Sequence, residues 1–75
     1  MIQLAQRIVV DDQILAGKPI IQGTRIPVSL VVGQLAGGES IEVIMEEYGI
    51  AREDVLAALL YASKVVADEE IREVK

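Results

Sequence analysis

The sequence predicts a single, mostly α-helical domain that begins with a short β-arm or hairpin. Two short β-branched segments lie within residues 1–26, whereas residues 27–75 hold three segments with apolar residues at helical spacing. The chain has 75 residues, enough for one domain at most. Hydrophobic residues make up 52% of it. Because a domain of this size cannot easily bury so much apolar surface, we expect a dimer.

The β-arm is predicted from two short segments. Ile8–Val10 is β-branched and ends at two aspartates, which is typical of a strand followed by a turn. Pro19–Gln22 fits a second strand, since Gly17 and Gly23 on either side tolerate positive φ. A two-stranded hairpin alone is marginal in water, so we expect the arm to pack on something else, with a second subunit as the first candidate.

The first two predicted helices have clear start and stop signals. Pro27 suits the first position of a helix, which then runs to the glycine pair at 37–38. Gly33 inside it costs about 1 kcal/mol relative to Ala, and we expect a neighbouring helix to approach closely there. Ser40 is a good N-cap for the second helix, and Gly49 supplies the left-handed residue that ends it.

The third predicted helix runs from about Arg52 into the acidic tail, and its apolar residues form two adjoining stripes. One stripe is enough for an intramolecular core, so the second indicates another contact surface. We predict a dimer interface at Leu56 and Leu60 of this second stripe and at Val43 of the preceding helix. The first stripe holds Val55, Leu59, Ala62 and Val66, and Ala67 belongs to the second.

The second and third helices, joined by a short Gly-containing turn, have the layout of a helix-turn-helix, as in homeodomain and winged-helix bundles. In that motif the second helix enters the DNA major groove. Acidic residues on the same helix would repel phosphates, which weakens the DNA hypothesis. Tyr61 could be either a contact or a packing residue. The candidate DNA contacts on the outward face are Arg52, Ala57, Tyr61 and Lys64.

The composition excludes several function classes. The chain has neither Cys nor His, which excludes zinc fingers, His-dependent triads and thiolate chemistry. Aromatic residues are 3% of the chain, too few for the stacking platforms of single-stranded nucleic-acid binders. The sequence has no phosphate-cradling loop, and no carboxylates at metal-ligand spacing. We therefore expect no enzyme, no catalytic residue, no metal and no cofactor.

Charge is unevenly distributed along the chain, whose net charge is -5. Residues 1–38 have a balance of +1 and residues 39–75 a balance of -6. Lys18 and Arg25, in the less acidic half, are candidate contacts for phosphates or for an acidic partner. Alternatively, Lys18 is simply solvated and Arg25 pairs with a carboxylate that fixes its turn. Arg72 and Lys75 form a second pair of candidate partner-binding cations.

The sequence shows no targeting signal. Met1–Arg7 lacks a basic n-region, and the longest uncharged stretch is far shorter than the roughly 20 residues that span a bilayer. We expect a soluble, cytoplasmic protein that contacts no membrane.

Three segments together resemble a known family. The string Gly-Lys-Pro, then apolar residues, then Gly-Thr-Arg-Ile-Pro-Val covers 17–28, and the match continues through 40–50 and 52–62. This pattern resembles the small bacterial and archaeal proteins known as domain of unknown function 433. The resemblance implies a β-arm before a helix-turn-helix-like bundle, a homodimer, and the antitoxin role in a toxin–antitoxin pair, often beside a PIN-like nuclease. It implies no catalytic residue.

The chain departs from that family at two places. Gln13 follows Asp12 where family members commonly have Asp-Pro, and Ala51 stands where they have a Ser or Thr cap. Losing that cap should cost about 1 kcal/mol at the start of the third helix.

Three functional hypotheses follow. The first is a non-enzymatic antitoxin, a homodimer that binds and masks a nuclease. The second is a sequence-specific DNA-binding regulator that represses its own operon. The third is a dimeric adaptor that binds neither DNA nor a toxin.

Overall fold

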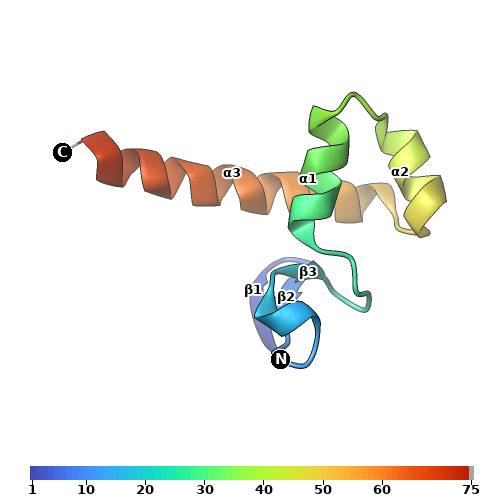
Figure 1. Cartoon of the computed structure of the whole chain (residues 1–75), viewed down its shortest axis with the longest axis horizontal. Helices are drawn as coiled ribbons and strands as arrows, with labels where there is room; N and C mark the ends of the chain where they lie inside the picture. Colours follow the sequence, from blue (N-terminus) through green and yellow to red (C-terminus); the bar gives the residue numbers. More distant parts are fainter. Residues whose placement is uncertain (75) are drawn as a thin grey trace.

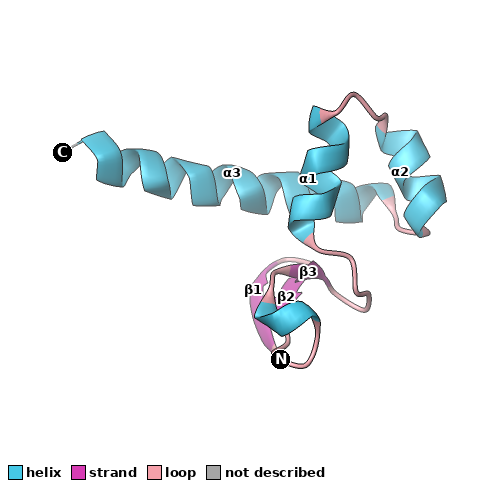
Figure 2. Cartoon of the chain, in the orientation of Figure 1, coloured by secondary structure: helices cyan, strands magenta, loops and turns pink. Residues whose placement is uncertain are grey.

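The computed structural model describes the backbone of residues 1–74 and the side chains of residues 1–69. A three-stranded sheet comes first and three helices follow, so the predicted mostly α fold with an N-terminal β-arm is confirmed (Figures 1 and 2). The elements are β1 (Ile2–Ala5), β2 (Ile8–Val10), a 3-10 turn (Leu15–Gly17), β3 (Ile20–Ile21), α1 (Val28–Ala36), α2 (Ile41–Tyr48) and α3 (Arg52–Val74).

The sheet has the order β1-β2-β3, and both pairings are antiparallel. The predicted hairpin forms with Ile8 opposite Ile21 and Val9 opposite Ile20. Strand β1 was not predicted, and it pairs with β2 as an edge strand of the sheet. The turn between β1 and β2 places Arg7 at φ +67°, although the sequence has no Gly or Asn there to indicate it.

One hydrophobic core joins the sheet to the helices. Ile8 and Ile21 of the sheet are fully buried in the same cluster as Val31, Ile44 and Val55 from the three helices. The arm therefore packs on its own chain, through β2 on α3, which confirms that it does not stand alone, and its contact with a second subunit stays a prediction. Burying the arm this way removes the apolar surface that a free hairpin would expose to water.

The predicted helix ends are confirmed, except that Pro27 has an extended backbone and is the N-cap of α1 rather than its first helical residue. The Ser40 hydroxyl accepts a hydrogen bond from the Val43 N–H at 3.1 Å, and Gly49 adopts a left-handed φ of +65°. Gly33 is exposed, and a Cβ built there would meet nothing within 4 Å. The close helix approach expected at Gly33 is therefore wrong.

Helix α3 continues well beyond the bundle. Helices α1 and α2 pack across its first half, and its C-terminal half projects away from them (Figure 1). Val55 is buried, as expected for the inner stripe, but Val66 on that stripe is 52% exposed, because it lines an open groove beside α1. None of the helices in the described part of the chain is long and apolar enough to cross a membrane.

Candidate protein-binding site

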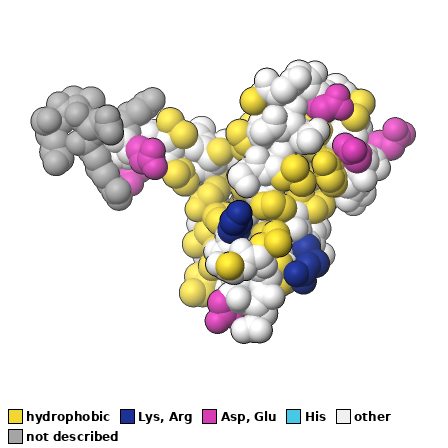
Figure 3. Space-filling view, viewed as in Figure 1, with side chains coloured by type: hydrophobic (Ala, Val, Ile, Leu, Met, Phe, Trp, Pro, Cys, Tyr) yellow, Lys and Arg dark blue, Asp and Glu magenta, His cyan; other side chains and the backbone are white. Residues whose placement is uncertain are grey.

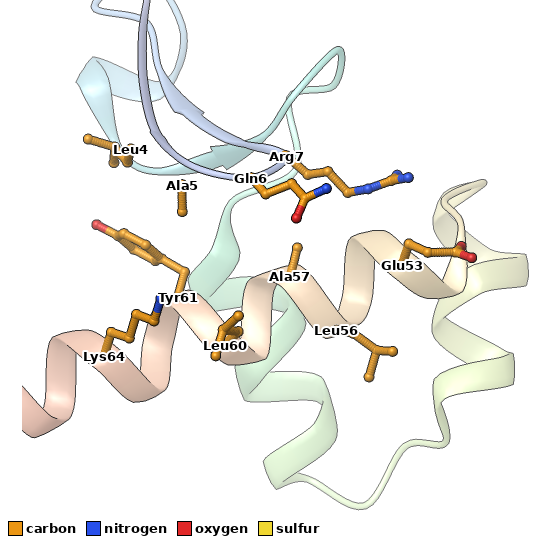
Figure 4. A pocket seen from close by; sticks show the side chains of 10 residues that line it. All are labelled: Leu4, Ala5, Gln6, Arg7, Glu53, Leu56, Ala57, Leu60, Tyr61 and Lys64. Carbon is orange, nitrogen blue, oxygen red and sulfur yellow. The ribbon is translucent and has the colours of Figure 1, made fainter.

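Two apolar depressions lie on either side of α3. The first, the strand groove, lies between residues 4–7, around the β1–β2 turn, and one face of α3 (Figure 4), with a volume of about 650 Å³. The second, the helix groove, lies between α1 and α3, with a volume of about 400 Å³. Tyr61 lines both grooves, so its ring separates them.

On the α3 side, the strand groove is lined by residues spaced three or four apart, which share one face of the helix. Leu56 is 46% exposed and Leu60 is 57% exposed, so the second stripe of α3 is left open as expected. Glu53 and Lys64 lie at opposite ends of this wall (Figure 4). Across the groove, Leu4 of β1 is 42% exposed.

The predicted DNA contacts are only partly on an open face. Ala57 and Tyr61 are half-buried and pack against the core, so the expectation that they point outward is wrong. The reason is the unpredicted strand β1, which with its turn places residues 4–7 opposite them. Lys64 is exposed on the strand groove, whereas Arg52 pairs with Glu42 of α2 at 3.3 Å.

An ion pair that the sequence did not indicate ties the sheet to α3. The Arg7 guanidinium donates to Asp54 Oδ1 at 2.9 Å, although 47 positions separate the two residues. The other carboxylate oxygen of Asp54 accepts from the Ala51 N–H, also at 2.9 Å. Asp54 thus supplies a hydrogen bond at the helix end where Ala51 lacks a capping hydroxyl. The only available sequence signal was an acidic residue in the first turn of a helix.

The helix groove is formed by small apolar side chains with one cation at its rim. Pro19, with Lys18 beside it, leads into β3, Val28 and Val32 come from α1, and Val65 and Val66 come from α3. Val65 and Val66 are 42% and 52% exposed, and Lys18 is also exposed. Figure 3 shows hydrophobic side chains across the face where the sheet, α1 and α3 meet, with basic side chains beside them.

Arg25 lies apart from both grooves, in the turn after β3. Its side chain is exposed and makes no ion pair within the described residues, so the alternative in which Arg25 fixes the turn by pairing is wrong for that part of the chain. Thr24 fixes the turn instead: its hydroxyl donates to the Ile21 carbonyl at 2.7 Å and accepts from the Ile26 N–H at 2.9 Å.

The remaining predicted site residues are not brought together with the grooves. Val43 is 43% exposed on α2 and lines neither groove. The side chains of Arg72 and Lys75 lie outside the described residues. Within the residues that are described, no three His, Cys, Asp or Glu side chains gather as metal ligands would.

A solved structure and a family resemble this chain. The crystal structure of Rv2018 from Mycobacterium tuberculosis is 27% identical, with a TM-score of 0.64. The match covers 69% of this chain and 24% of Rv2018, so the matched part corresponds to about a quarter of that protein. Comparison with curated proteins gives no match. The family described as protein of unknown function DUF433 matches residues 8–62, which include β2, β3, α1, α2 and the first half of α3. The chain therefore belongs to the DUF433 family.

Proposed function

We propose that this protein is a non-enzymatic, cytoplasmic antitoxin, a homodimer that binds and masks a PIN-like nuclease. The family resemblance implies this role, and membership of the DUF433 family supports the proposal. The helix groove is the observation on which the proposal rests. It is an open apolar surface whose rim carries Lys18, in the half of the chain that is not acidic.

The chemistry of this groove suits a protein partner that carries carboxylates. Val65 and Val66 offer apolar area whose burial would contribute about 25 cal/mol per Å². Lys18 would place a positive charge beside that contact, which favours an acidic surface over a neutral one. A metal-dependent nuclease with a carboxylate cluster is such a surface. Arg25 is also exposed on the first half of the chain and is kept as a second candidate cation.

The direct experiment is co-expression with the product of the adjacent gene, which the proposal expects to be a nuclease, followed by co-purification and a growth assay. We expect a stable complex and restored growth. Lys18→Glu and Val66→Asp should each weaken the complex and the rescue of growth. Lys18→Glu reverses the charge at the rim, and Val66→Asp puts a charge on the apolar contact surface. Neither side chain is buried, so far-UV circular dichroism and the Tm should stay unchanged.

Val43→Asp is the matched control, since Val43 has similar exposure on α2 and lies outside both grooves. Because Val43 is also a predicted dimer-interface residue, sedimentation must first show that this variant is dimeric. Equal loss of rescue with Val43→Asp and Val66→Asp would remove the helix groove from the proposal. If the neighbouring product is neither toxic nor bound, the antitoxin role fails and the dimeric adaptor becomes the better hypothesis.

DNA recognition is the second candidate, and the observation that favours it is the layout of α2 and α3. The two helices are joined by a three-residue turn, residues 49–51, as in a helix-turn-helix. Against it stand the net charge of -5 per chain and the pairing of Arg52 with Glu42. A gel-shift assay with the protein's own promoter tests it at low and moderate salt. A shift that Lys64→Ala weakens would support it, and the absence of a shift at both salt concentrations would remove it.

A further inference from the structure

We propose that a second copy of this chain covers the strand groove, with the two α3 helices packed antiparallel across a two-fold axis. This inference deepens the proposed function, because it gives the homodimer a surface and a register. It does not depend on the nuclease partner. The argument rests on the order of charged and apolar side chains along one face of α3.

The centre of this face is apolar and open. Leu56 and Leu60 are about half exposed, and Leu4, which lines the same groove, is 42% exposed. A groove of about 650 Å³ beside these side chains leaves room for leucines from another molecule. In an isologous contact the same patch meets itself, so the two leucines of each α3 would pack between the leucines of the other.

The ends of the face carry opposite charges. Glu53 lies at one end and Lys64 at the other, with Leu56 and Leu60 between them (Figure 4). Eleven residues of helix separate the two charges by about 16 Å along the axis. When two such helices run antiparallel, Glu53 of each copy meets Lys64 of the other, which gives two ion pairs related by symmetry. A parallel arrangement would place like charges opposite each other, so the charge pattern selects the antiparallel one.

The two charges are available for this role. Arg7, also on the groove wall, already pairs with Asp54, and Arg52 pairs with Glu42. Neither Glu53 nor Lys64 has an ion pair within the described residues, and both are exposed. The apolar face is therefore bounded by one carboxylate and one ammonium that are unpaired among residues 1–69.

This dimer has a consequence for the other candidate functions. It would cover Lys64 and the outer edge of Tyr61, so α3 could not present them to DNA. The helix groove lies on the other side of Tyr61 and would stay open in each copy. One homodimer would therefore offer two equivalent sites to a protein partner.

Charge reversal tests the arrangement by sedimentation velocity over a concentration series. The unaltered protein should be a dimer at micromolar concentration. Glu53→Lys and Lys64→Glu should each raise the dimer Kd by about tenfold or more, because two attractive pairs become repulsive. Glu53→Lys combined with Lys64→Glu should restore the dimer. Glu46→Lys, an exposed charge reversal on α2 outside both grooves, should change nothing.

A mixing experiment distinguishes loss of the ion pairs from misfolding of the variants. The E53K protein carries Lys at both ends of the face and the K64E protein carries Glu at both ends. Mixed in equal amounts, the two should form a heterodimer more stable than either homodimer. A monomeric unaltered protein, or a mixture that sediments as the average of its components, would overturn the proposal. The antitoxin role is tested separately, since K18E and V66D should leave the dimer intact while weakening the rescue of growth.

Discussion

Replacing Asp54 by Ala is the most informative perturbation of the fold, because this carboxylate joins the sheet to α3. One oxygen accepts from Arg7 on the β1–β2 turn and the other accepts from the Ala51 N–H, each at 2.9 Å. The Asp54 side chain is 17% exposed and that of Arg7 is 42% exposed. Asp54→Ala removes both hydrogen bonds at once, and further variants measure the contribution of each bond to stability separately.

The expected cost can be assembled from the two bonds. Loss of a side-chain bond at a helix N-terminus costs about 1 kcal/mol. The ion pair is worth about 0.5 kcal/mol, since water reaches much of Arg7. Asp54→Ala should therefore lower the free energy of unfolding by about 1.5 kcal/mol, which lowers the Tm by about 6 to 12 °C for a domain of this size. Arg7→Ala alone should cost about 0.5 kcal/mol.

Urea unfolding of the two single variants and the double variant gives the coupling energy directly. We expect about 0.5 kcal/mol of coupling between Arg7 and Asp54. Asp54→Asn is the control: its amide oxygen can still accept from the Ala51 N–H, so it should lose the ion pair and keep most of the helix-end contribution. Additive single variants would show that the ion pair contributes nothing. An Asp54→Ala cost no larger than that of Asp54→Asn would refute the role at the helix end.

Three further predictions concern single positions. Gly33→Ala should stabilise the protein by about 0.5 to 1 kcal/mol in urea unfolding, because nothing lies near a Cβ there, and a destabilisation would restore the close contact predicted from the sequence. Thr24→Val should cost about 1 to 2 kcal/mol through the loss of its two hydrogen bonds, whereas Thr24→Ser should keep most of the stability; equal losses would contradict this. Arg25→Ala should leave the Tm unchanged and weaken neutralisation of the nuclease. Equal loss of stability and neutralisation would make Arg25 a structural residue.

The helices could be predicted because their signals are local. Pro27 lies just before α1, Ser40 caps α2 and Gly49 ends it, and each of these effects depends on neighbours within four residues. The open second stripe of α3 was also predictable, since Leu56 and Leu60 exceed what one intramolecular core can bury.

The features that escaped prediction depend on contacts distant in sequence or on unusual backbone. Strand β1 comes before a turn at Arg7 that has a positive φ without Gly or Asn, so no turn residue marked the end of this strand. Without β1, the face of α3 that holds Ala57 and Tyr61 was expected to be open. The pairing of Arg7 with Asp54 joins residues 47 positions apart, which no local pattern could reveal.

The helix groove was likewise not predictable as a site. Lys18 was recognised as a candidate because it lies in the less acidic half of the chain. Its place beside Val65 and Val66 depends on how far α3 projects past α1, which only the packing of the two helices decides. Because the sequence does not show this packing, it placed Val66 on the inner stripe of α3, which was expected to be in the core.

The central claim is tested most directly by titrating this protein into the purified product of the adjacent gene, which the proposal expects to be a nuclease. Substrate cleavage should fall in proportion to added protein and end at a fixed stoichiometric ratio. Val66→Asp should shift that titration to higher concentration, and Val43→Asp should not. Undiminished cleavage at saturating protein would contradict the proposal that the chain masks a nuclease.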